Sequence, residues 1–208
     1  MADDSPVHLE VRSPLQFDRA QLLLRVALAV GLAWFGITAG WLSCLVFGTL
    51  PIIAAVAISS LGALGFQRDF APRLWRVLRW LLQLSAYMTL LIDRFPTGEN
   101  DAVHIDVRCT GTPTIGSALA RLITTIPSAL ALAILGCVAS FLWLIAAGLV
   151  LLGGPMPPWI LAFQRGMLRW QARLVAYHAS LVDEYPPFHF ETDVDDNHSA
   201  PLAVSGTP

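Results

Sequence analysis

The stretch from Leu122 to Gln164 reads LITTIPSALALAILGCVASFLWLIAAGLVLLGGPMPPWILAFQ, which is 43 residues without one Asp, Glu, Lys or Arg. A second charge-free stretch of 42 residues runs from Val26 to Gln67. A helix needs about 20 apolar residues to cross a hydrocarbon core of about 30 Å. Each stretch is therefore long enough for two crossings and a turn, and the sequence predicts an integral membrane protein.

The composition of the whole chain agrees with this prediction. Hydrophobic residues make up 55% of the 208 residues, charged residues only 13%, and the mean hydropathy is +0.61. A soluble domain usually carries about 25% charged residues, so this chain lacks the polar surface that water requires. The formal net charge of -2 also excludes the concentrated basic excess of a nucleic-acid-binding protein. We therefore expect membrane lipids as partners and no nucleic acid.

Arginines flank both charge-free stretches at both ends. They are Arg19, Arg25, Arg68, Arg73, Arg121, Arg165 and Arg169. Because basic residues tend to stay in the cytoplasm, placing all four ends on one side makes each stretch a hairpin. This predicts a multi-pass membrane protein with four crossings and both termini cytoplasmic.

The position of the turn differs between the two predicted hairpins. In the first stretch the turn is expected at Gly48-Thr49-Leu50-Pro51, close to the centre. In the second, the helix-breaking run from Gly153 to Pro158 lies off-centre. The alternative is one long tilted helix in each half, interrupted near Pro127 in the second, followed by a helix on the membrane surface.

An internal duplication is visible without any alignment. The sequence VHLEVR at 7–12 returns as VHIDVR at 103–108, an offset of 96 residues. A later set returns at an offset of 90 residues: Trp80, Tyr87, Asp93 and Pro96 match Trp170, Tyr177, Asp183 and Pro186. We predict two tandem membrane repeats, 7–97 and 103–191, with an N-terminal tail 1–6, a linker 98–102 and a disordered tail 192–208.

Each repeat is expected to contain the same elements, which gives a mainly α integral membrane fold. A short strand with alternating apolar and polar residues precedes the apolar hairpin. An amphipathic helix closes the repeat at the membrane interface, over Arg73–Asp93 in the first and Trp159–Glu184 in the second. The two strands form a small cytoplasmic β pairing, and Phe188–Glu191 is a candidate third strand.

The closing stretch of the second repeat resembles a known bacterial family. QRGMLRWQARLVAY at 164–177 and LVDEYPPF at 181–188 are similar to an uncharacterised membrane domain of unknown function with an RW..R..AY....DEYPPF-like ending. The first repeat has Arg94-Phe95-Pro96-Thr97 in place of the full ending. The resemblance implies a location in the bacterial inner membrane and a shared fold, and it implies no activity.

The candidate contact residues are arginines on the closing helices. They are Arg73, Arg76, Arg79, Arg165, Arg169 and Arg173. These side chains suit lipid headgroups or a membrane partner, although arginines at such positions also simply mark the cytoplasmic side. Asp93 and Asp183 suit a local cap, an ion pair with an arginine, or a proton relay.

The sequence offers little that predicts catalysis or a cofactor. Four histidines, His8, His104, His178 and His189, have no spacing that demands a metal. Neither charge-free stretch contains a histidine that would ligate a haem. Serines such as Ser43 and Ser128 lie among apolar residues with no His or Asp nearby in the sequence. We therefore expect no catalytic residue, no metal and no cofactor.

The leading functional hypothesis is a non-enzymatic accessory or scaffold subunit that binds lipid headgroups, another membrane protein or a second copy of itself. The second is a small transporter or lipid-handling protein with a path between the repeats, since transporters often contain such repeats. The third is an enzyme acting on a membrane lipid.

Overall fold

The computed structural model describes residues 6–14, 16–34, 39–97, 103–110 and 112–186. Two short strands, β1 (Val7–Val11) and β2 (Val103–Val107), pair antiparallel with Leu9 opposite Ile105. Both lie where the sequence predicts them, and alternate residues point inward, including the buried Leu9 and Ile105. The candidate third strand at Phe188–Glu191 lies outside the described residues.

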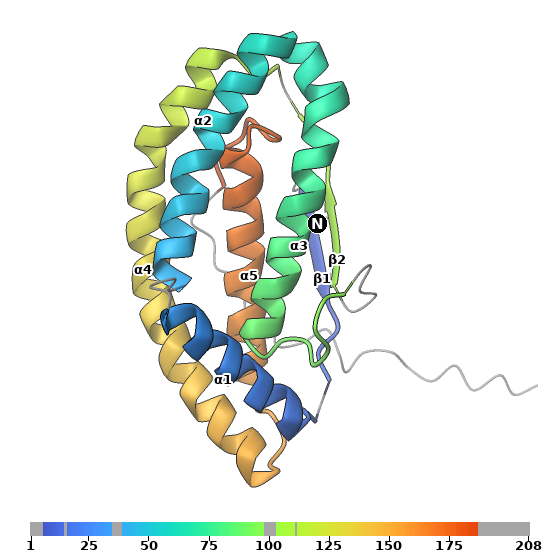
Figure 1. Ribbon diagram of the computed structural model, residues 1–208, viewed down its shortest axis with the longest axis vertical. Helices are drawn as coiled ribbons and strands as arrows, with labels where there is room; N and C mark the ends of the chain where they lie inside the picture. The colour runs from blue at the N-terminus through green and yellow to red at the C-terminus, as the bar shows by residue number, and fades with distance from the viewer. Residues whose placement is uncertain (1–5, 15, 35–38, 98–102, 111, 187–208) are drawn as a thin grey trace, which may run out of the picture.

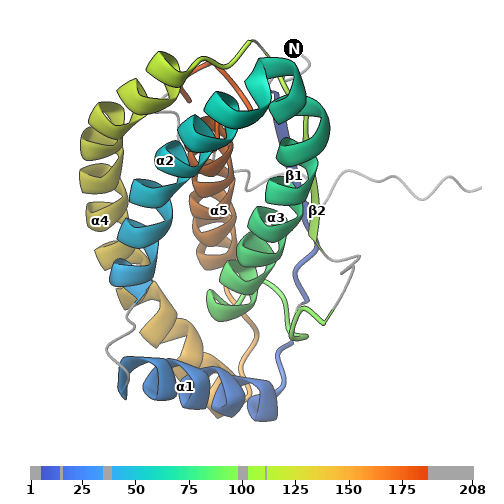
Figure 2. The same ribbon diagram turned by 45° about the horizontal axis from the view of Figure 1, so that its top comes forward.

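The rest of the described chain is mainly helical. The helices are α1 (Arg19–Trp34), α2 (Ala39–Gly65), the π-turn η1 (Phe66–Phe70), α3 (Ala71–Met88), α4 (Ile115–Leu152) and α5 (Pro158–His178). Helices α2 to α5 run side by side along the long axis of the molecule, and α1 crosses α4 near one end (Figure 1). Figure 2 shows the same bundle with α5 enclosed by its neighbours.

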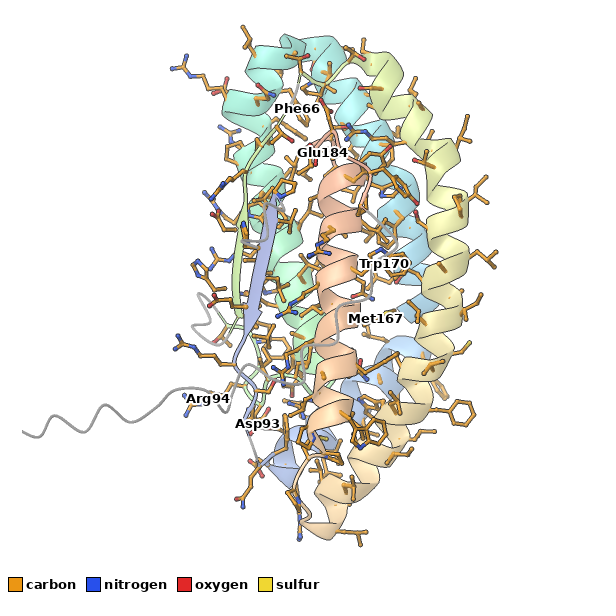
Figure 3. The ribbon with its side chains drawn as sticks, turned by 180° about the vertical axis from the view of Figure 1, so that it is seen from behind. Phe66, Asp93, Arg94, Met167, Trp170 and Glu184 are labelled. Atoms are coloured by element: carbon orange, nitrogen blue, oxygen red, sulfur yellow. The ribbon has the colours of Figure 1, made fainter. Side chains whose placement is uncertain are left out.

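Helix α5 is the centre of the bundle because it contacts α2, α3, α4 and β1. The strand pair covers one side of α5, and α2 and α4 cover the other (Figure 3). Side chains such as Leu168, Leu174 and Trp170 are buried as a result. The helix predicted here as amphipathic is therefore packed on several sides within the bundle, since its apolar residues surround most of its circumference.

The turn predicted at Gly48–Pro51 is wrong. Helix α2 continues through all four residues, and Pro51 is buried inside it. Proline removes only one helix hydrogen bond, and the Thr49 hydroxyl donates to the carbonyl of Leu45 at 2.7 Å. Of the described helices, α1 ends at Trp34 and α2 begins at Ala39. A bend follows at Gly62, where φ of 72° suits glycine.

The second charge-free stretch forms most of α4, a turn and the start of α5, so the helix-breaking run predicted from Gly153 to Pro158 does separate two helices, which pack against each other. Helix α4 starts at a capping box, in which Thr114 Oγ1 accepts from the Ser117 N–H at 3.1 Å and Ser117 Oγ accepts from the Thr114 N–H at 3.0 Å. It passes through Pro127 without the interruption expected in the alternative. It ends at Gly153, whose φ of 75° and following prolines stop the helix.

Two helical segments of the described chain are long and apolar enough to cross a membrane. One is Leu42–Met88, which joins α2, η1 and α3, and the other is Leu130–Leu152 inside α4. This finding rests on length and composition and gives no orientation.

Candidate functional site

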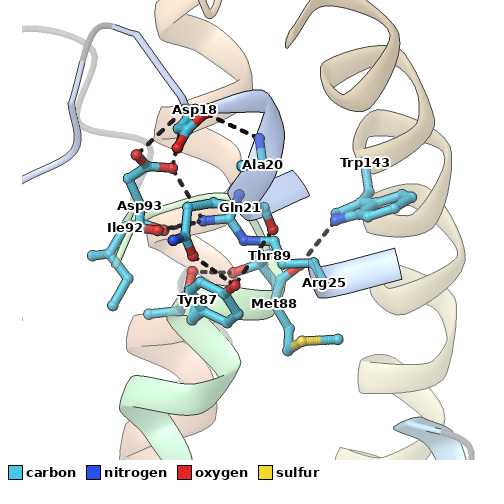
Figure 4. A network of polar contacts seen from close by, with 11 residues as sticks. Asp18, Ala20, Gln21, Arg25, Tyr87, Met88, Thr89, Ile92, Asp93 and Trp143 are labelled. Carbon is cyan, nitrogen blue, oxygen red and sulfur yellow. Dashed lines mark hydrogen bonds and ion pairs between the residues drawn. The ribbon is translucent and has the colours of Figure 1, made fainter. Parts of the chain in front are cut away.

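A buried arginine is bound into a network where α1 meets the end of α3 (Figure 4). Arg25 on α1 has no exposed surface. Its Nη2 donates to the carbonyl of Ile92 at 2.7 Å and lies 3.5 Å from Asp93 Oδ1. Its guanidinium carbon lies 4.3 Å from the centre of the Tyr87 ring, a cation–π distance. We call Arg25, Tyr87 and Asp93 the first clasp.

The first clasp is tied to the start of α1 by further hydrogen bonds. The Tyr87 hydroxyl donates to Gln21 Oε1 at 3.0 Å. The Asp93 carboxylate accepts from the Asp18 N–H at 3.3 Å, and Asp18 in turn caps α1 by accepting from the Ala20 N–H at 3.0 Å. The clasp therefore fixes α1 against the closing turn of α3.

A second arrangement of the same residue types lies between α4 and the end of α5. Arg121 is 3% exposed. It donates to the carbonyl of Tyr177 and, through Nη2, to Asp183 Oδ1 at 2.8 Å. Its guanidinium carbon lies 4.5 Å from the centre of the Tyr177 ring. We call Arg121, Tyr177 and Asp183 the second clasp.

Both closing helices end in the same way, and this ending presents the clasp partners. Leu90 and Ser180 adopt left-handed φ angles of 60° and 58°. The N–H of Leu91 bonds to Ala86 O and that of Leu181 to Ala176 O, each at 3.0 Å, as in a Schellman motif. The helices therefore stop at Met88 and His178, earlier than the predicted Asp93 and Glu184, which leaves both aspartates free to turn back onto their arginines.

Burial is the main electrostatic influence on the clasp arginines. It lowers the pKa of Arg25 below its usual range, and the nearby Tyr87 and Asp93 oppose this shift. The pKa of Arg121 is lowered by burial in the same way and raised by Tyr177 and Asp183. Arginine keeps its proton in proteins, so each clasp neutralises its guanidinium with one carboxylate. Of the roles considered for Asp93 and Asp183, the structure places both in ion pairs.

The predicted arginine rows lie in different surroundings. On α3, Arg73 and Arg76 are exposed and Arg79 is half-buried. On α5, Arg165, Arg169 and Arg173 are all half-buried, and Arg169 Nε donates to the carbonyl of Leu9 in β1 at 3.4 Å. Only the α3 row therefore lies on an open face of the bundle.

The remaining signature residues pack around the clasps. Trp80 Nε1 donates to the carbonyl of Pro96 at 3.3 Å, and Trp170 is buried on α5. Tyr87 packs edge-on against Phe95, with ring centres 5.4 Å apart, and Tyr177 packs edge-on against Tyr185 at 5.2 Å. Pro186 is the last described residue of its signature and is buried.

The histidines do not come together. His8 and His104 lie on the outer side of the strand pair, opposite Asp106 and Glu10. His178 is fully buried at the end of α5, where its Nδ1 lies 2.7 Å from the Leu174 carbonyl. His189 lies outside the described residues. Within the described part of the chain, no three His, Cys, Asp or Glu side chains are close enough to share a metal ion.

A second feature of the surface is a broad apolar face made by α1, α2 and α4. Large hydrophobic side chains are exposed along the whole length of α4, from Ile115 at 44% to Leu152 at 84%. The only charged residue of α4 is the buried Arg121. We define the apolar face by its most exposed members. They are Leu23, Val30, Trp34, Val56, Leu64, Ile123, Ile126, Leu130, Ile134, Phe141, Leu144 and Leu152.

Hydroxyl groups on this side of the bundle bond to their own helices. Ser59 Oγ donates to the Val56 carbonyl at 2.8 Å, and Ser140 Oγ donates to the Gly136 carbonyl at 2.8 Å. Polar groups that face hydrocarbon need such internal partners, because lipid tails offer none. The face is therefore suited to lipid rather than to water.

Comparison with known families gives one match. Residues 116–189 match the model of a domain of unknown function, DUF4389. The match covers the second clasp and the closing stretch whose sequence resembles such a family. Neither curated proteins nor solved structures give a match to this chain.

The sequence identified the tyrosine and aspartate of each clasp but missed the arginine. Arg25 and Arg121 were assigned only to the flanks of the charge-free stretches. The signal was nevertheless present, because these two arginines are 96 residues apart, the same offset as the repeated strands.

Proposed function

We propose that the chain is a non-enzymatic membrane scaffold, held in the bilayer by its apolar face and contacting lipid headgroups through the arginines of α3. The observation that carries this proposal is the apolar face itself. Soluble monomers rarely expose contiguous apolar patches larger than a few hundred Å², whereas here three helices expose large hydrophobic side chains, and α4 exposes no charged side chain from Ile115 to Leu152.

We propose also that the scaffold arose by tandem duplication of one unit. The two clasps relate residues at the offsets found in the sequence, 96 for the arginines and 90 for the tyrosines and aspartates. The strand register supports the same idea, since Val7 pairs with Val107 and Val11 with Val103. This register is what a two-fold axis through the Leu9–Ile105 pair would produce.

The headgroup contact is supported by the composition of α3. Helix α3 contains three arginines and no acidic residue. Arg73, Arg76 and Trp80 are exposed on it, a combination that is typical of the interface between lipid and water. Anionic headgroups complement this charge without a further protein partner.

Membrane fractionation tests the anchoring. Wild-type protein is expected to stay in the membrane pellet after alkaline carbonate extraction. Ile134→Asp with Phe141→Asp, both on the outward side of α4, should release it, whereas Ile134→Leu with Phe141→Leu should not. Release of the wild-type protein by carbonate would refute the proposal.

Affinity purification from native membranes tests the scaffold role. Mild-detergent isolation followed by protein and lipid identification is expected to recover anionic lipid together with a stoichiometric membrane protein. A chain that purifies with neither would contradict the scaffold role. Flux across liposomes, lost in a clasp variant, would favour the transporter alternative instead.

A further inference from the structure

The layers of the bundle differ in polarity, and this difference bears on how the molecule lies in lipid. Helices α2 and α4 form the apolar side, α3 and α5 lie beneath them, and the strand pair covers α5 on the far side (Figures 1 and 3). The outer side of the strand pair carries Glu10, His104 and Asp106, all exposed. Polarity therefore changes across the bundle, from the apolar helices α2 and α4 to the strand pair.

Two hydrogen bonds fix the level of the strand pair relative to α4. Gln164 Nε2 on α5 donates to the carbonyl of Ala139, near the middle of the apolar segment Leu130–Leu152. Arg169, five residues further along α5, donates to the carbonyl of Leu9. Five residues of helix rise about 7.5 Å, which is less than the half-thickness of about 15 Å of a hydrocarbon core.

An upright bundle would therefore carry the strand pair into the hydrocarbon. If Leu130–Leu152 crossed the bilayer, Leu9 and its neighbour Glu10 would lie at lipid depth. Charged side chains have a high free-energy cost in lipid.

On the basis of the proposed membrane anchoring, we propose that the bundle lies in the plane of the membrane, with its apolar face sunk into the acyl chains of one leaflet and its strand pair in water. Helices α2 and α4 then face lipid tails along their full length. The α3 arginines lie at the headgroups, where their charge complements anionic lipid. Every exposed charge named above leaves the hydrocarbon.

The lipid leaflet fits this face better than a second copy of the chain does. Helix α1 exposes Leu23, Leu24 and Leu32, which lie on different sides of the helix. A rigid protein surface can cover one side of such a helix, whereas fluid acyl chains cover all its free sides. The neighbouring arginine row has no acidic counterpart on the described outer surfaces of α2 and α4 that a second copy would offer.

Polarised infrared spectroscopy tests the orientation with the unmodified chain. Helices α2 to α5 share one direction, so their amide I dichroism in an oriented bilayer of anionic and zwitterionic lipid reports how that direction lies. We expect the axes of these helices to lie in the plane of the membrane. Order along the membrane normal would overturn the inference.

Cysteine labelling gives an independent test. In a background where Cys44, Cys109 and Cys137 are alanine, Asp69→Cys and Pro155→Cys place thiols at opposite ends of the bundle, and Glu10→Cys marks the strand pair. An impermeant maleimide is expected to reach all three from the same side of sealed vesicles. Labelling of the two ends from opposite sides would overturn the in-plane arrangement while leaving membrane anchoring intact, whereas loss of the unmodified chain from the membrane pellet would remove both.

Discussion

The guanidinium of Arg25 lies 4.3 Å from the centre of the Tyr87 ring, and that of Arg121 lies 4.5 Å from the centre of the Tyr177 ring. In each case the arginine belongs to the first helix after a strand, and the tyrosine lies in the last turn of a closing helix. The stacked pair thus joins the beginning and the end of the segment between them. Since both arginines are buried and paired, their removal should lower the free energy of unfolding.

Arg25→Ala is expected to lower the free energy of unfolding by about 3 kcal/mol, because it removes the partner of the Ile92 carbonyl and of the Asp93 carboxylate. Thermal unfolding in detergent micelles measures this. Arg76→Ala, which removes an exposed arginine of α3, is the matched control and should change stability by less than about 0.5 kcal/mol. Equal effects of the two substitutions would show that the clasp has no structural role.

Ser180→Gly is expected to raise the free energy of unfolding by about 1 kcal/mol, since Ser180 has a left-handed φ of 58° and its buried Oγ has no hydrogen-bond partner among the described residues. Ser180→Ala removes the hydroxyl but keeps the unfavourable φ. The alanine variant should therefore be less stable than the glycine variant. The reverse order in chemical denaturation would contradict the conformational argument.

His178 predicts a dependence of stability on pH. Burial lowers its pKa below the usual 6.5, the positive charge of Arg121 lowers it further, and the bond to Leu174 opposes the shift. The folded state therefore binds the proton less readily than the unfolded state, so stability is complete above about pH 6.5 and falls as the pH drops below it.

Unfolding midpoints between pH 5 and 8 measure this effect. Met88 ends α3 at the position that corresponds to His178 at the end of α5. The variant His178→Met should therefore be tolerated, and its stability should fall less steeply at acid pH than that of the wild-type protein. An unchanged acid slope in the variant would assign the pH dependence to other groups.

Arg73→Ala with Arg76→Ala is expected to weaken the preference for anionic over zwitterionic lipid by about fivefold for each arginine, which corresponds to about 1 kcal/mol each near a charged surface. Spin-labelled lipids in reconstituted bilayers measure the preference. Arg12→Ala with Arg108→Ala removes two exposed arginines beside the strand pair and should leave it unchanged. If both double variants lost the preference for anionic lipid to the same extent, the preference would reflect nonspecific charge attraction.

Local pattern and long-range packing differ in how well the sequence predicts them here. The alternation of Val7, Leu9 and Val11 with polar residues identified β1 and its partner, because a two-residue period has one structural meaning. The turn at Pro51 was predicted wrongly, since a proline in an apolar helix can be accommodated when neighbouring groups compensate. Gly153 stopped α4 as a left-handed glycine followed by prolines should.

The site was only partly predictable for a different reason. Tyr87 and Asp93 stand out because they recur in sequence, but Arg25 is recognised as their partner only when α1 is folded against the end of α3. The central position of α5 was likewise hidden, since Arg165, Arg169 and Arg173 indicate a solvent-facing side, whereas all three are half-buried and Arg169 bonds to β1. Contacts between segments distant in the chain decide both features.

Three native cysteines allow the most direct measurement of the central claim, that the apolar face lies in lipid. Cys44 on α2, Cys137 on α4 and Cys109 after β2 are all exposed free thiols. Opened native membranes are treated with an impermeant maleimide, and the labelled sites are identified by mass spectrometry. The account predicts rapid labelling of Cys109, with Cys44 and Cys137 protected until detergent is added; labelling of all three at the same rate before detergent would contradict it.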